Sequence, residues 1–525
     1  MPKVLIADSL SPRALAIFKE RGIEADVKTG LKPDELKAAI GPYDGLAVRS
    51  SAKVTADVIA GAKNLKVIGR AGIGVDTIDV PAATARGIVV MNTPYGNSIT
   101  TAEHAIALMF ALARQLPAAD RSTQAGKWEK NRFLGVELTG KTLGIVGCGN
   151  IGSIVADRAL ALKMKVIAYD PFLSPERALK LGVEKVELDQ LYARADFITL
   201  HTPLTDATRN LIDKNAFAKM KKGVQIINCA RGELIVQDDL KAALDAKIVA
   251  GAALDVFPVE PAKTSVLFGR DDVIATPHLG ASTLEAQENV ALQVAEQISD
   301  FLLTGAVTNA INLPSVSGEE AAKLRPYMEL ASKLGSYLGQ LNDRNVRSVT
   351  IEYEGQASGL NVKPLTSCVL AGFLGTQLAT VNMVNAPALA RERAIDVIET
   401  RHRGVSDYLN LIRVTVDADG HKRKIAGSVF GASRPRIVQI AEIAIEAEFG
   451  KHMIYVRNED KPGFIGNLGR TLGDAGVNIA SFNLGRTAPG AEAICLVEID
   501  QPLTDAVLAK VQAIPLVKQA RVLRF

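Results

Sequence analysis

Residues 141–170 read KTLGIVGCGNIGSIVADRALALKMKVIAYD, and this stretch decides the fold. An apolar run from Leu143 to Val146 leads into a cluster of glycines. A helical segment follows to Leu162, and a second apolar run ends at Asp170. The order is strand, glycine turn, helix, strand, which is the repeating unit of a parallel sheet covered by helices.

Gly147, Gly149 and Gly152 have the spacing G-x-G-x-x-G. In this motif the first glycine allows a tight turn, the second lets a pyrophosphate approach the backbone, and the third permits close packing of helix on strand. The phosphates would lie at the positive end of the helix that begins near Asn150. The stretch therefore predicts a dinucleotide site, and the alternative is a βαβ unit whose glycines serve packing alone.

Asp170 closes the second strand and is placed to accept hydrogen bonds from the ribose hydroxyls of the adenosine. A carboxylate at this position repels the 2′-phosphate of NADP. The next basic residue along the chain is Arg177. NAD is therefore the expected cofactor.

Composition sets broad limits. A chain of 525 residues, 48% of them hydrophobic, is long enough for roughly three to four domains with buried cores. With 61 basic and 57 acidic residues the net charge is only +4, which gives no general case for nucleic-acid binding. The four cysteines are far apart and lack metal-ligand spacing, so we expect reduced thiols and no metal site.

No targeting or membrane segment is expected. The chain begins with PKVLIADSL, which resembles a short strand and lacks the charged and apolar regions of a leader. The apolar run Ala105 to Ala113 is too short to cross a bilayer. We therefore expect a cytoplasmic protein.

The first 95 residues alternate short β-rich runs with helical ones, which predicts a first α/β domain with a parallel sheet. Arg49 and Ser50 follow its GLAV strand, and the small-residue run 71–74 follows KVIGR. Ligands of such sheets bind beyond the carboxyl ends of the strands. Arg49 is expected to meet an anion there, with a surface salt bridge as the alternative, and the small loop offers bare amides to a carboxylate.

A long helix, Thr100 to Leu116, is predicted to cross to the glycine-turn domain. Further strands are expected at residues 195–202, 224–229, 248–255 and 273–277, each ending in a polar residue at the cofactor cleft. A helix from Leu284 to Leu303 would return the chain to the first domain.

Three of these strand ends carry Arg231, Glu260 and His278. Oxidation of a secondary alcohol by hydride transfer needs a base for the hydroxyl proton and a cation for the substrate oxygens. His278 is the expected base and Arg231 the expected cation. Glu260 would fix the imidazole tautomer and favour the imidazolium. Singly, such a histidine is often structural and Glu-Pro is a common turn, so the inference depends on all three occurring together.

These motifs resemble those of the D-2-hydroxyacid dehydrogenase family over residues 1 to about 313, with GCGNIG, NCARG, a Glu before Pro, and PHLG. The resemblance implies a split substrate-binding domain, 1–97 with 284–313, around an NAD-binding domain, 98–283. It also implies a dimer formed through the NAD-binding domains. The positions that it assigns to NAD are Gly147, Gly149, Asn150, Ile151, Gly152, Asp170, Thr202, Cys229, Ala230, Arg231, Asp255, His278, Gly280 and Ala281.

The long members of this family oxidise 3-phosphoglycerate to 3-phosphohydroxypyruvate at the entry to serine biosynthesis. By this resemblance the amides of Ala71 and Gly72 hold the substrate carboxylate, and Arg49 and Ser50 lie near the phosphate. Gln287 is expected to line the site, and Arg132 to reach the site of the neighbouring subunit. One departure is Ile73, where many relatives have Thr.

The C-terminal third needs a separate explanation. Residues 313–318 are expected to be a linker, and 318–448 resemble the intervening regulatory domain of the long members. Its basic residues could gather an anion such as the phosphorylated substrate, or form a solvated face. Where the relatives carry a second cation, this chain has Glu448. The basic residues are His421, Lys422, Arg423, Lys424, Arg434 and Arg436.

From residue 452 to 525 the pattern is strand, helix, strand, strand, helix, strand, which is the ferredoxin-like order. The NEDKPG turn and the GVNI segment resemble an ACT domain, a module that binds amino acids. The resemblance implies that Asp460 and Asn478 clasp L-serine across a subunit interface, and a dimerisation module without a ligand is the alternative. Two dimerising elements predict a homotetramer.

Two other functions remain open at this point. One is a hydroxypyruvate or glyoxylate reductase of the same family, which would depend little on Arg49 and Arg132. The other is an NAD-sensing corepressor or scaffold, which the complete set of Arg231, Glu260 and His278 disfavours.

Overall fold

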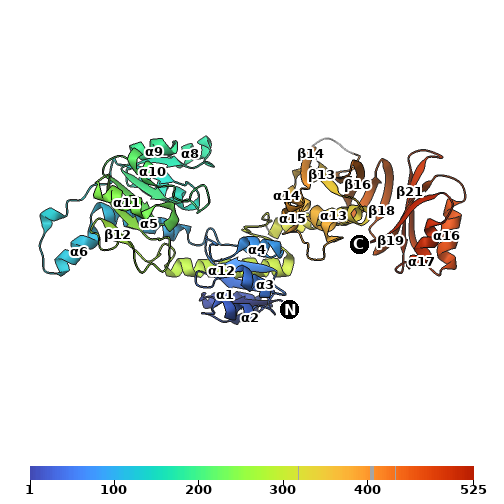
Figure 1. The fold of residues 1–525 in the computed structure, drawn as a ribbon, viewed down its shortest axis with the longest axis horizontal. Helices are drawn as coiled ribbons and strands as arrows, with labels where there is room; N and C mark the ends of the chain where they lie inside the picture. Colours follow the sequence, from blue (N-terminus) through green and yellow to red (C-terminus); the bar gives the residue numbers. More distant parts are fainter. Residues whose placement is uncertain (317, 403–406, 432) are drawn as a thin grey trace.

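The computed structural model describes residues 1–316, 318–402, 407–431 and 433–525. Four β-sheets, each covered by helices, follow one another along an elongated molecule, with the glycine-turn domain at one end and the last domain at the other (Figure 1). The predicted fold class is confirmed: two parallel α/β sheets are followed by an α+β domain and a ferredoxin-like domain.

The first sheet is parallel, with the order β2-β1-β3-β4-β5. Both of its faces are buried, each under its own apolar cluster, as a parallel sheet requires. Its strands are β1 (Lys3–Ile6), β2 (Glu24–Val27), β3 (Gly45–Val48), β4 (Val67–Arg70) and β5 (Val89–Met91). Its helices are α1 (Pro12–Glu20), α2 (Pro33–Ala39), α3 (Ala56–Gly61) and α4 (Val80–Ala85).

The second sheet is also parallel, with the order β12-β11-β10-β9-β6-β7-β8. The order reverses between β6 and β9, and ligands of such sheets bind beyond the carboxyl ends of the strands at this point. Its strands are β6 (Thr142–Val146), β7 (Lys165–Tyr169), β8 (Glu184–Lys185), β9 (Phe197–Leu200), β10 (Val224–Asn228), β11 (Val249–Leu254) and β12 (Val273–Ala275). Its helices are α7 (Asn150–Ala161), α8 (Pro175–Leu181), α9 (Leu188–Arg194), α10 (Lys214–Lys219) and α11 (Gln237–Asp245), with the 3-10 turns η1 (Lys130–Arg132) and η2 (Gly232–Leu234).

Two long helices connect the sheets. α12 (Leu284–Thr304) packs on α1, β3 and β4 of the first sheet, and α5 (Ser98–Ala113) packs on α7, β10 and β11 of the second. The helix predicted from Thr100 to Leu116 extends beyond the observed end of α5 at Ala113. Gln115 has a left-handed φ of 52°, which an α-helix cannot accommodate, and a separate helix α6 (Leu116–Gln124) follows.

The third sheet has the order β14-β13-β15-β16-β17-β18 and is antiparallel except for β13 with β14. It is packed against two helices, α13 (Gly318–Leu341) and α14 (Val362–Gly375), with α15 (Ala386–Glu392) at one side (Figure 1). Its strands are β13 (Val346–Gly355), β14 (Asp396–His402), β15 (Asn410–Ala418), β16 (His421–Phe430), β17 (Arg434–Ile440) and β18 (Ile443–Glu448).

The last domain has the predicted βαββαβ order, with the antiparallel sheet β20-β21-β19-β22. One face of this sheet shares an apolar cluster with the third domain, where the ring of Tyr455 packs edge to face on that of Tyr337 in α13, with 6.1 Å between the ring centres. Its elements are β19 (His452–Glu459), α16 (Phe464–Asp474), β20 (Ile479–Arg486), β21 (Glu492–Ile499), α17 (Asp505–Gln512) and β22 (Val517–Arg524).

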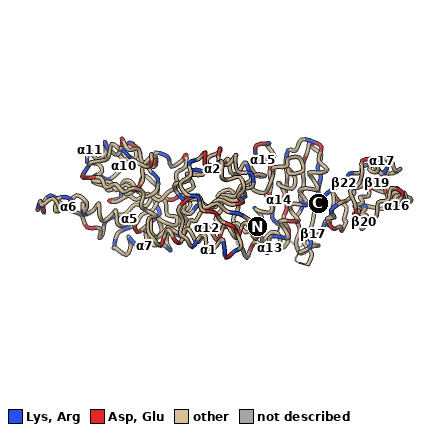
Figure 2. Tube along the Cα trace, turned by 90° about the horizontal axis from the view of Figure 1, so that it is seen from below, with Lys and Arg blue, Asp and Glu red and all other residues tan. Residues whose placement is uncertain are grey.

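Charges of both signs occur in every part of the molecule (Figure 2), in keeping with the small net charge of +4. Among the described residues, no helix combines the length and the apolar character needed to cross a membrane.

Glycines let α13 and α14 approach very closely. A Cβ added to Gly372 would lie 2.0 Å from the carbonyl oxygen of Ser332, so alanine cannot fit without moving a helix backbone. We predict that Gly372→Ala destabilises the third domain by about 1–3 kcal/mol. Gly375→Ala is the matched control, because nothing lies within 4 Å of a Cβ at that position of the same helix. Hydrogen exchange in α13 and α14 measures the effect, and equal protection in the two variants would contradict it.

Candidate active site

The glycine turn between β6 and α7 has the geometry that a dinucleotide requires. Gly147 has a φ of 91°, and a Cβ there would lie 2.5 Å from the carbonyl oxygen of His201. A Cβ on Gly152 would lie 2.0 Å from the carbonyl oxygen of Gly147. Gly149, in contrast, faces open space with no atom within 4 Å of its added Cβ. A phosphate can therefore approach the backbone at Gly149 and the start of α7, where Asn150 and Ile151 lie.

Asp170 lies directly beside this turn. Its Oδ2 accepts a hydrogen bond from the amide of Cys148 at 2.8 Å, and its Oδ1 accepts one from the amide of Phe172 at the same distance. These bonds fix the carboxylate at the end of β7 while leaving it partly exposed. The turn and the acid fit the adenosine half of NAD.

Arg231, after β10, joins the two parallel sheets. Its Nε and Nη2 donate to Oδ2 of Asp76, at 3.0 and 2.8 Å, and Asp76 belongs to the loop after β4 of the first sheet. The guanidinium lies so close to Gly74 that an added Cβ would be 1.8 Å from Nη2. Asn228 closes the Arg231 loop by donating from Nδ2 to the carbonyl oxygen of Arg231 at 2.8 Å. Burial would raise the pKa of Asp76, but the charge and hydrogen bonds of Arg231 lower it below its ordinary value.

His278 and Glu260 form a direct pair, with 2.6 Å between Nδ1 and Oε2. The other oxygen of Glu260 accepts from the amide of Phe257 at 3.0 Å. Burial would raise the pKa of Glu260, but the hydrogen bonds from His278 and Phe257 and the nearby charge of Arg231 lower it below its ordinary value. Nε2 of the imidazole is thereby left to face a substrate.

Asp255 fixes the loop that carries His278. Its carboxylate is fully buried and accepts from the Thr276 hydroxyl at 2.6 Å and from the amides of Leu279 and Gly280 at 2.7 and 2.8 Å. Burial acts to raise the pKa of Asp255, but the hydrogen bonds from His104, Thr276 and Leu279 lower it below its ordinary value. His278 itself has a left-handed φ of 56°, an unusual and strained conformation for a residue with a side chain. Such strain is typical of functional sites.

His104 of α5 is a neighbour that the sequence did not single out. Its Nε2 lies 3.2 Å from Oδ1 of Asp255, and a Cys229 sulfur completes a cluster of possible metal ligands within 4.8 Å. Burial raises the pKa of the Cys229 thiol, which keeps it protonated and makes it a poor ligand. The cluster is therefore better explained as packing beneath the His278 loop.

The amides of Ala71 and Gly72, which were expected to hold the substrate carboxylate, already donate hydrogen bonds within the protein. The amide of Ala71 donates to the carbonyl oxygen of Val48 at 2.8 Å, and that of Gly72 donates to the Thr93 hydroxyl at 2.6 Å. An amide N–H donates one good hydrogen bond, so these two are not available in this conformation. In the described part of the chain, the next two amides, of Ile73 and Gly74, have no acceptor.

Arg70, the last residue of β4, is a cation that the sequence analysis missed. Its guanidinium lies against Gly72, where an added Cβ would be 1.9 Å from Nη1, and its Nε donates to the carbonyl oxygen of Arg49 at 3.3 Å. Burial, together with the positive charges of Arg231 and Arg49, lowers the pKa of Arg70 to about 10. The signal in the sequence was its place at the carboxyl end of a strand. Arg70 and Arg231 thus lie against one loop, at Gly72 and Gly74, and Arg49 is next to Arg70.

The remaining predicted residues lie at varying distances from this cleft. Arg49 follows β3 and its amide donates to Asp8 at 2.6 Å, and Ser50 is exposed. Gln287 is half-buried in the first turn of α12. Arg132 pairs with Glu129 and Asp271 on the exposed side of the second domain. Thr202, Cys229, Ala230 and Ala281 lie on the loops that follow β9, β10 and β12.

Asp460 and Asn478 lie at opposite ends of the last sheet. Asp460 accepts from Arg486 at 2.7 Å and from the Gly490 amide at 3.0 Å, whereas Asn478 donates to Asp500 at 2.7 Å. Asn478 precedes β20, and Asp460 contacts Arg486 at the far end of this strand. The eight residues of β20 therefore separate them by about 25 Å. One amino acid therefore cannot contact both residues of a single chain.

Several of the basic residues in the third domain are neutralised. Arg436 pairs with Glu448 at 2.6 Å, Lys424 with Glu442 at 3.2 Å, and Arg423 with Asp343 at 3.6 Å. These ion pairs favour the interpretation of the basic residues as a solvated surface over their interpretation as an anion-binding site.

Comparison with known proteins agrees with this geometry. Residues 106–280 match the NAD binding domain of the D-isomer specific 2-hydroxyacid dehydrogenases, 323–441 the D-3-phosphoglycerate dehydrogenase intervening domain, and 452–516 the ACT domain. D-3-phosphoglycerate dehydrogenase of Synechocystis sp. is 44% identical over 522 residues, which cover 99% of this chain and 94% of that protein. The enzyme of the same name from Methanocaldococcus jannaschii is 43% identical over 525 residues, all of both chains.

The chain belongs to the D-isomer specific 2-hydroxyacid dehydrogenase family. It is an NAD-dependent dehydrogenase with an intervening domain and an ACT domain, as the motifs predicted. Among solved structures, D-lactate dehydrogenase from Aquifex aeolicus complexed with NAD and lactic acid is 27% identical with a TM-score of 0.52. The match covers 59% of this dehydrogenase and 100% of that chain.

The pair of Glu260 with His278 predicts a loss of rate when the carboxylate is removed. In Glu260→Gln the imidazole loses its charged hydrogen-bond partner at Nδ1, so the ring is less well oriented and kcat for alcohol oxidation should fall about tenfold or more. Glu137→Gln, an exposed acid of the same domain, should leave kcat unchanged. A kcat for Glu260→Gln equal to that of the parent enzyme would exclude this role.

Proposed function

We propose that this dehydrogenase oxidises 3-phospho-D-glycerate to 3-phosphohydroxypyruvate with NAD, the first step of serine biosynthesis by the phosphorylated route. The observation that carries the proposal is the meeting of Arg231, Glu260 and His278 at one edge of the NAD-binding sheet, opposite a loop that two arginines lie against. Relatives called D-3-phosphoglycerate dehydrogenase, which match along the whole chain, support the choice of substrate.

His278 acts as the base in this proposal. Its Nε2 takes the proton of the substrate hydroxyl, while Glu260 at Nδ1 stabilises the imidazolium that forms. NAD, when bound, accepts the hydride. Arg231 holds the oxygen of the developing carbonyl, and Asp76 keeps the guanidinium oriented across the cleft. Nη1 of Arg231 donates one N–H to the carbonyl oxygen of Ala230 at 2.6 Å and Nη2 donates one to Asp76, so each nitrogen keeps a second N–H without a partner among the described residues.

The first-sheet loop binds the acid end of the substrate. We assign the carboxylate to the amides of Ile73 and Gly74 and to Arg70, in place of Ala71 and Gly72, because only the later pair lacks an acceptor among the described residues. Arg49 and Ser50 then lie toward the phosphate, and Arg132 would come from a neighbouring subunit. Residues 1–97 with 284–313 serve as the substrate-binding domain, and 98–283 as the NAD-binding domain.

L-Serine is the proposed effector of the ACT domain. Because Asp460 and Asn478 lie about 25 Å apart along the sheet, each serine site must combine Asp460 of one chain with Asn478 of another. Such a site requires at least a dimer of ACT domains. A second contact through the NAD-binding domains would give the homotetramer, and we place the enzyme in the cytoplasm.

The substrate assignment predicts a clear order of activity. NADH formation should be fastest by kcat/KM with 3-phosphoglycerate, ahead of D-lactate, D-glycerate and 2-hydroxyglutarate. Arg70→Met should lower kcat/KM for 3-phosphoglycerate about tenfold or more, because a charge-assisted contact is lost. Lys63→Met removes an exposed cation of the same domain and should have no effect.

A preference for an unphosphorylated acid would overturn the substrate and favour the reductase alternative. A protein that binds NAD but turns over none of these acids would favour the sensing alternative. His278→Asn is the internal control, because it should bind NAD and lose most of kcat.

The shared serine site predicts complementation between variants. Asp460→Ala and Asn478→Ala should each weaken serine inhibition about tenfold or more, while Asp474→Ala, an exposed acid of α16, should not. Chains of the two variants mixed within one oligomer leave one site intact in each hybrid pair, so part of the inhibition should return. Identical inhibition in all variants, or no recovery on mixing, would exclude this site.

A further inference from the structure

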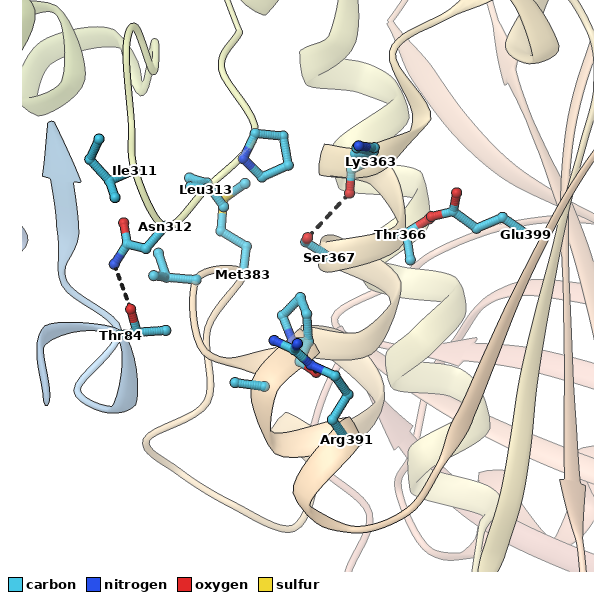
Figure 3. A pocket seen from close by; sticks show the side chains of 14 residues that line it. Thr84, Ile311, Asn312, Leu313, Lys363, Thr366, Ser367, Met383, Arg391 and Glu399 are labelled. Carbon is cyan, nitrogen blue, oxygen red and sulfur yellow. Dashed lines mark hydrogen bonds between the residues drawn. The ribbon is translucent and has the colours of Figure 1, made fainter. Parts of the chain in front are cut away.

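A cavity of about 660 Å³ lies between the first α/β domain and the third domain, outside the active cleft (Figure 3). One wall comes from the first domain: Thr84 at the end of α4 and the segment 311–314 that follows α12. The other wall comes from α14, α15 and β14 of the third domain. Its size falls within the usual range of small-molecule sites, roughly 300–1,000 Å³.

Two cations of this cavity lack acidic partners. Lys363 and Arg391 are both exposed residues that line it, and neither forms an ion pair with any described residue. The Arg391 side chain extends from α15 into the cavity (Figure 3), and its Nε makes one long hydrogen bond, 3.4 Å, to the carbonyl oxygen of Pro387. The outer nitrogens of the guanidinium are left to bind an anion.

The one carboxylate of the lining is already engaged. Glu399 of β14 accepts a hydrogen bond from the Thr366 hydroxyl at 2.5 Å, and the Thr366 oxygen is also 2.9 Å from the hydroxyl of buried Tyr353. Glu399 is thereby held at one side, and the lining carries a net positive charge. Leu313, Met383 and further apolar residues form the rest of the surface.

The cavity adjoins the joint between the two domains. Asn382 donates from Nδ2 to the carbonyl oxygen of Gly87 at 2.9 Å, and Asn385 donates to that of Ala85 at 3.2 Å. Val384, between them, packs into the core of the first domain and also lines the cavity. A molecule in the cavity therefore touches both domains at the point where they are fastened together.

We propose that this cavity is a regulatory site for a small organic acid. The anionic group, a carboxylate or a phosphate, is held by Arg391 and Lys363, and the apolar part of the ligand lies against Leu313 and Met383. Occupancy stiffens the joint at residues 382–385 and so links the regulatory third of the chain to the substrate-binding domain. The site is separate from the proposed serine site and does not depend on the identity of the substrate.

Calorimetric titration of the full chain with citrate and with inorganic phosphate tests the proposal and separates the two kinds of anion. At least one probe should bind, and Arg391→Gln should weaken its binding about tenfold or more. Lys363→Gln combined with Arg391→Gln should abolish this binding. Arg393→Gln, an exposed arginine two residues further along with no acidic partner among the described residues, is the matched control and should change the affinity by less than about twofold.

Hydrogen exchange gives a second measurement on the same proteins. The bound probe should slow exchange at residues 84–87 and 382–391, and this protection should disappear in the double variant. The proposal is overturned if neither probe binds, if binding survives the double variant, or if protection appears only in the active cleft.

Discussion

The guanidinium of Arg231 is the point on which the two catalytic sheets converge. Asp76 binds it from the first sheet, where Gly74 leaves room for it, and Asn228 binds its backbone from the second. Because ligands of parallel sheets bind at the carboxyl ends of the strands, two such sheets can share a substrate only if these ends face one another. The Asp76 side chain is 58% exposed, and an ion pair of this exposure is worth only about 1 kcal/mol or less. It can orient the arginine without locking the cleft closed.

Two carboxylates near His278 have different tasks because their environments differ. Asp255 is fully buried and its oxygens are occupied by donors of the His278 loop, so it acts as an anchor for the backbone. Loss of such a buried and fully bonded charge costs far more than loss of an exposed one. Glu260 is partly exposed and directs one oxygen at the imidazole. It therefore influences the proton held by His278 rather than the fold.

The third domain and the ACT domain pack together around one hydrophobic core. The third sheet and the ACT sheet share a continuous apolar cluster, which includes Leu496 of β21 and Leu523 of β22. Contact with the catalytic part is smaller and partly polar, through Asn382 and Asn385. Within one chain, these hydrogen bonds join the third domain, which packs on the ACT domain, to the first domain. The cavity of about 660 Å³ lies beside this joint and is lined from both domains.

Local patterns in the sequence determined much of this protein. Alternating apolar runs predicted two parallel sheets, the glycine spacing predicted the turn beside Asp170, and strand ends identified Arg231, Glu260 and His278, because each depends on residues that are close along the chain. Only the tertiary structure showed which hydrogen bonds form between residues that are far apart in the sequence. The amides of Ala71 and Gly72 donate to Val48 and Thr93, more than twenty residues away, whereas those of Ile73 and Gly74 have no acceptor in the described part of the chain.

The same reason explains the other differences. Asp76 binds Arg231, which is 155 residues further along the chain, and Asn382 donates to Gly87, which is 295 residues earlier. The separation of Asp460 from Asn478 follows from strand register, which short motifs do not encode. The sequence by itself therefore determined which chemical groups this protein carries at its strand ends. The folded structure decided which of their donors and acceptors remain free, because a hydrogen bond is satisfied by whatever group the fold brings within reach.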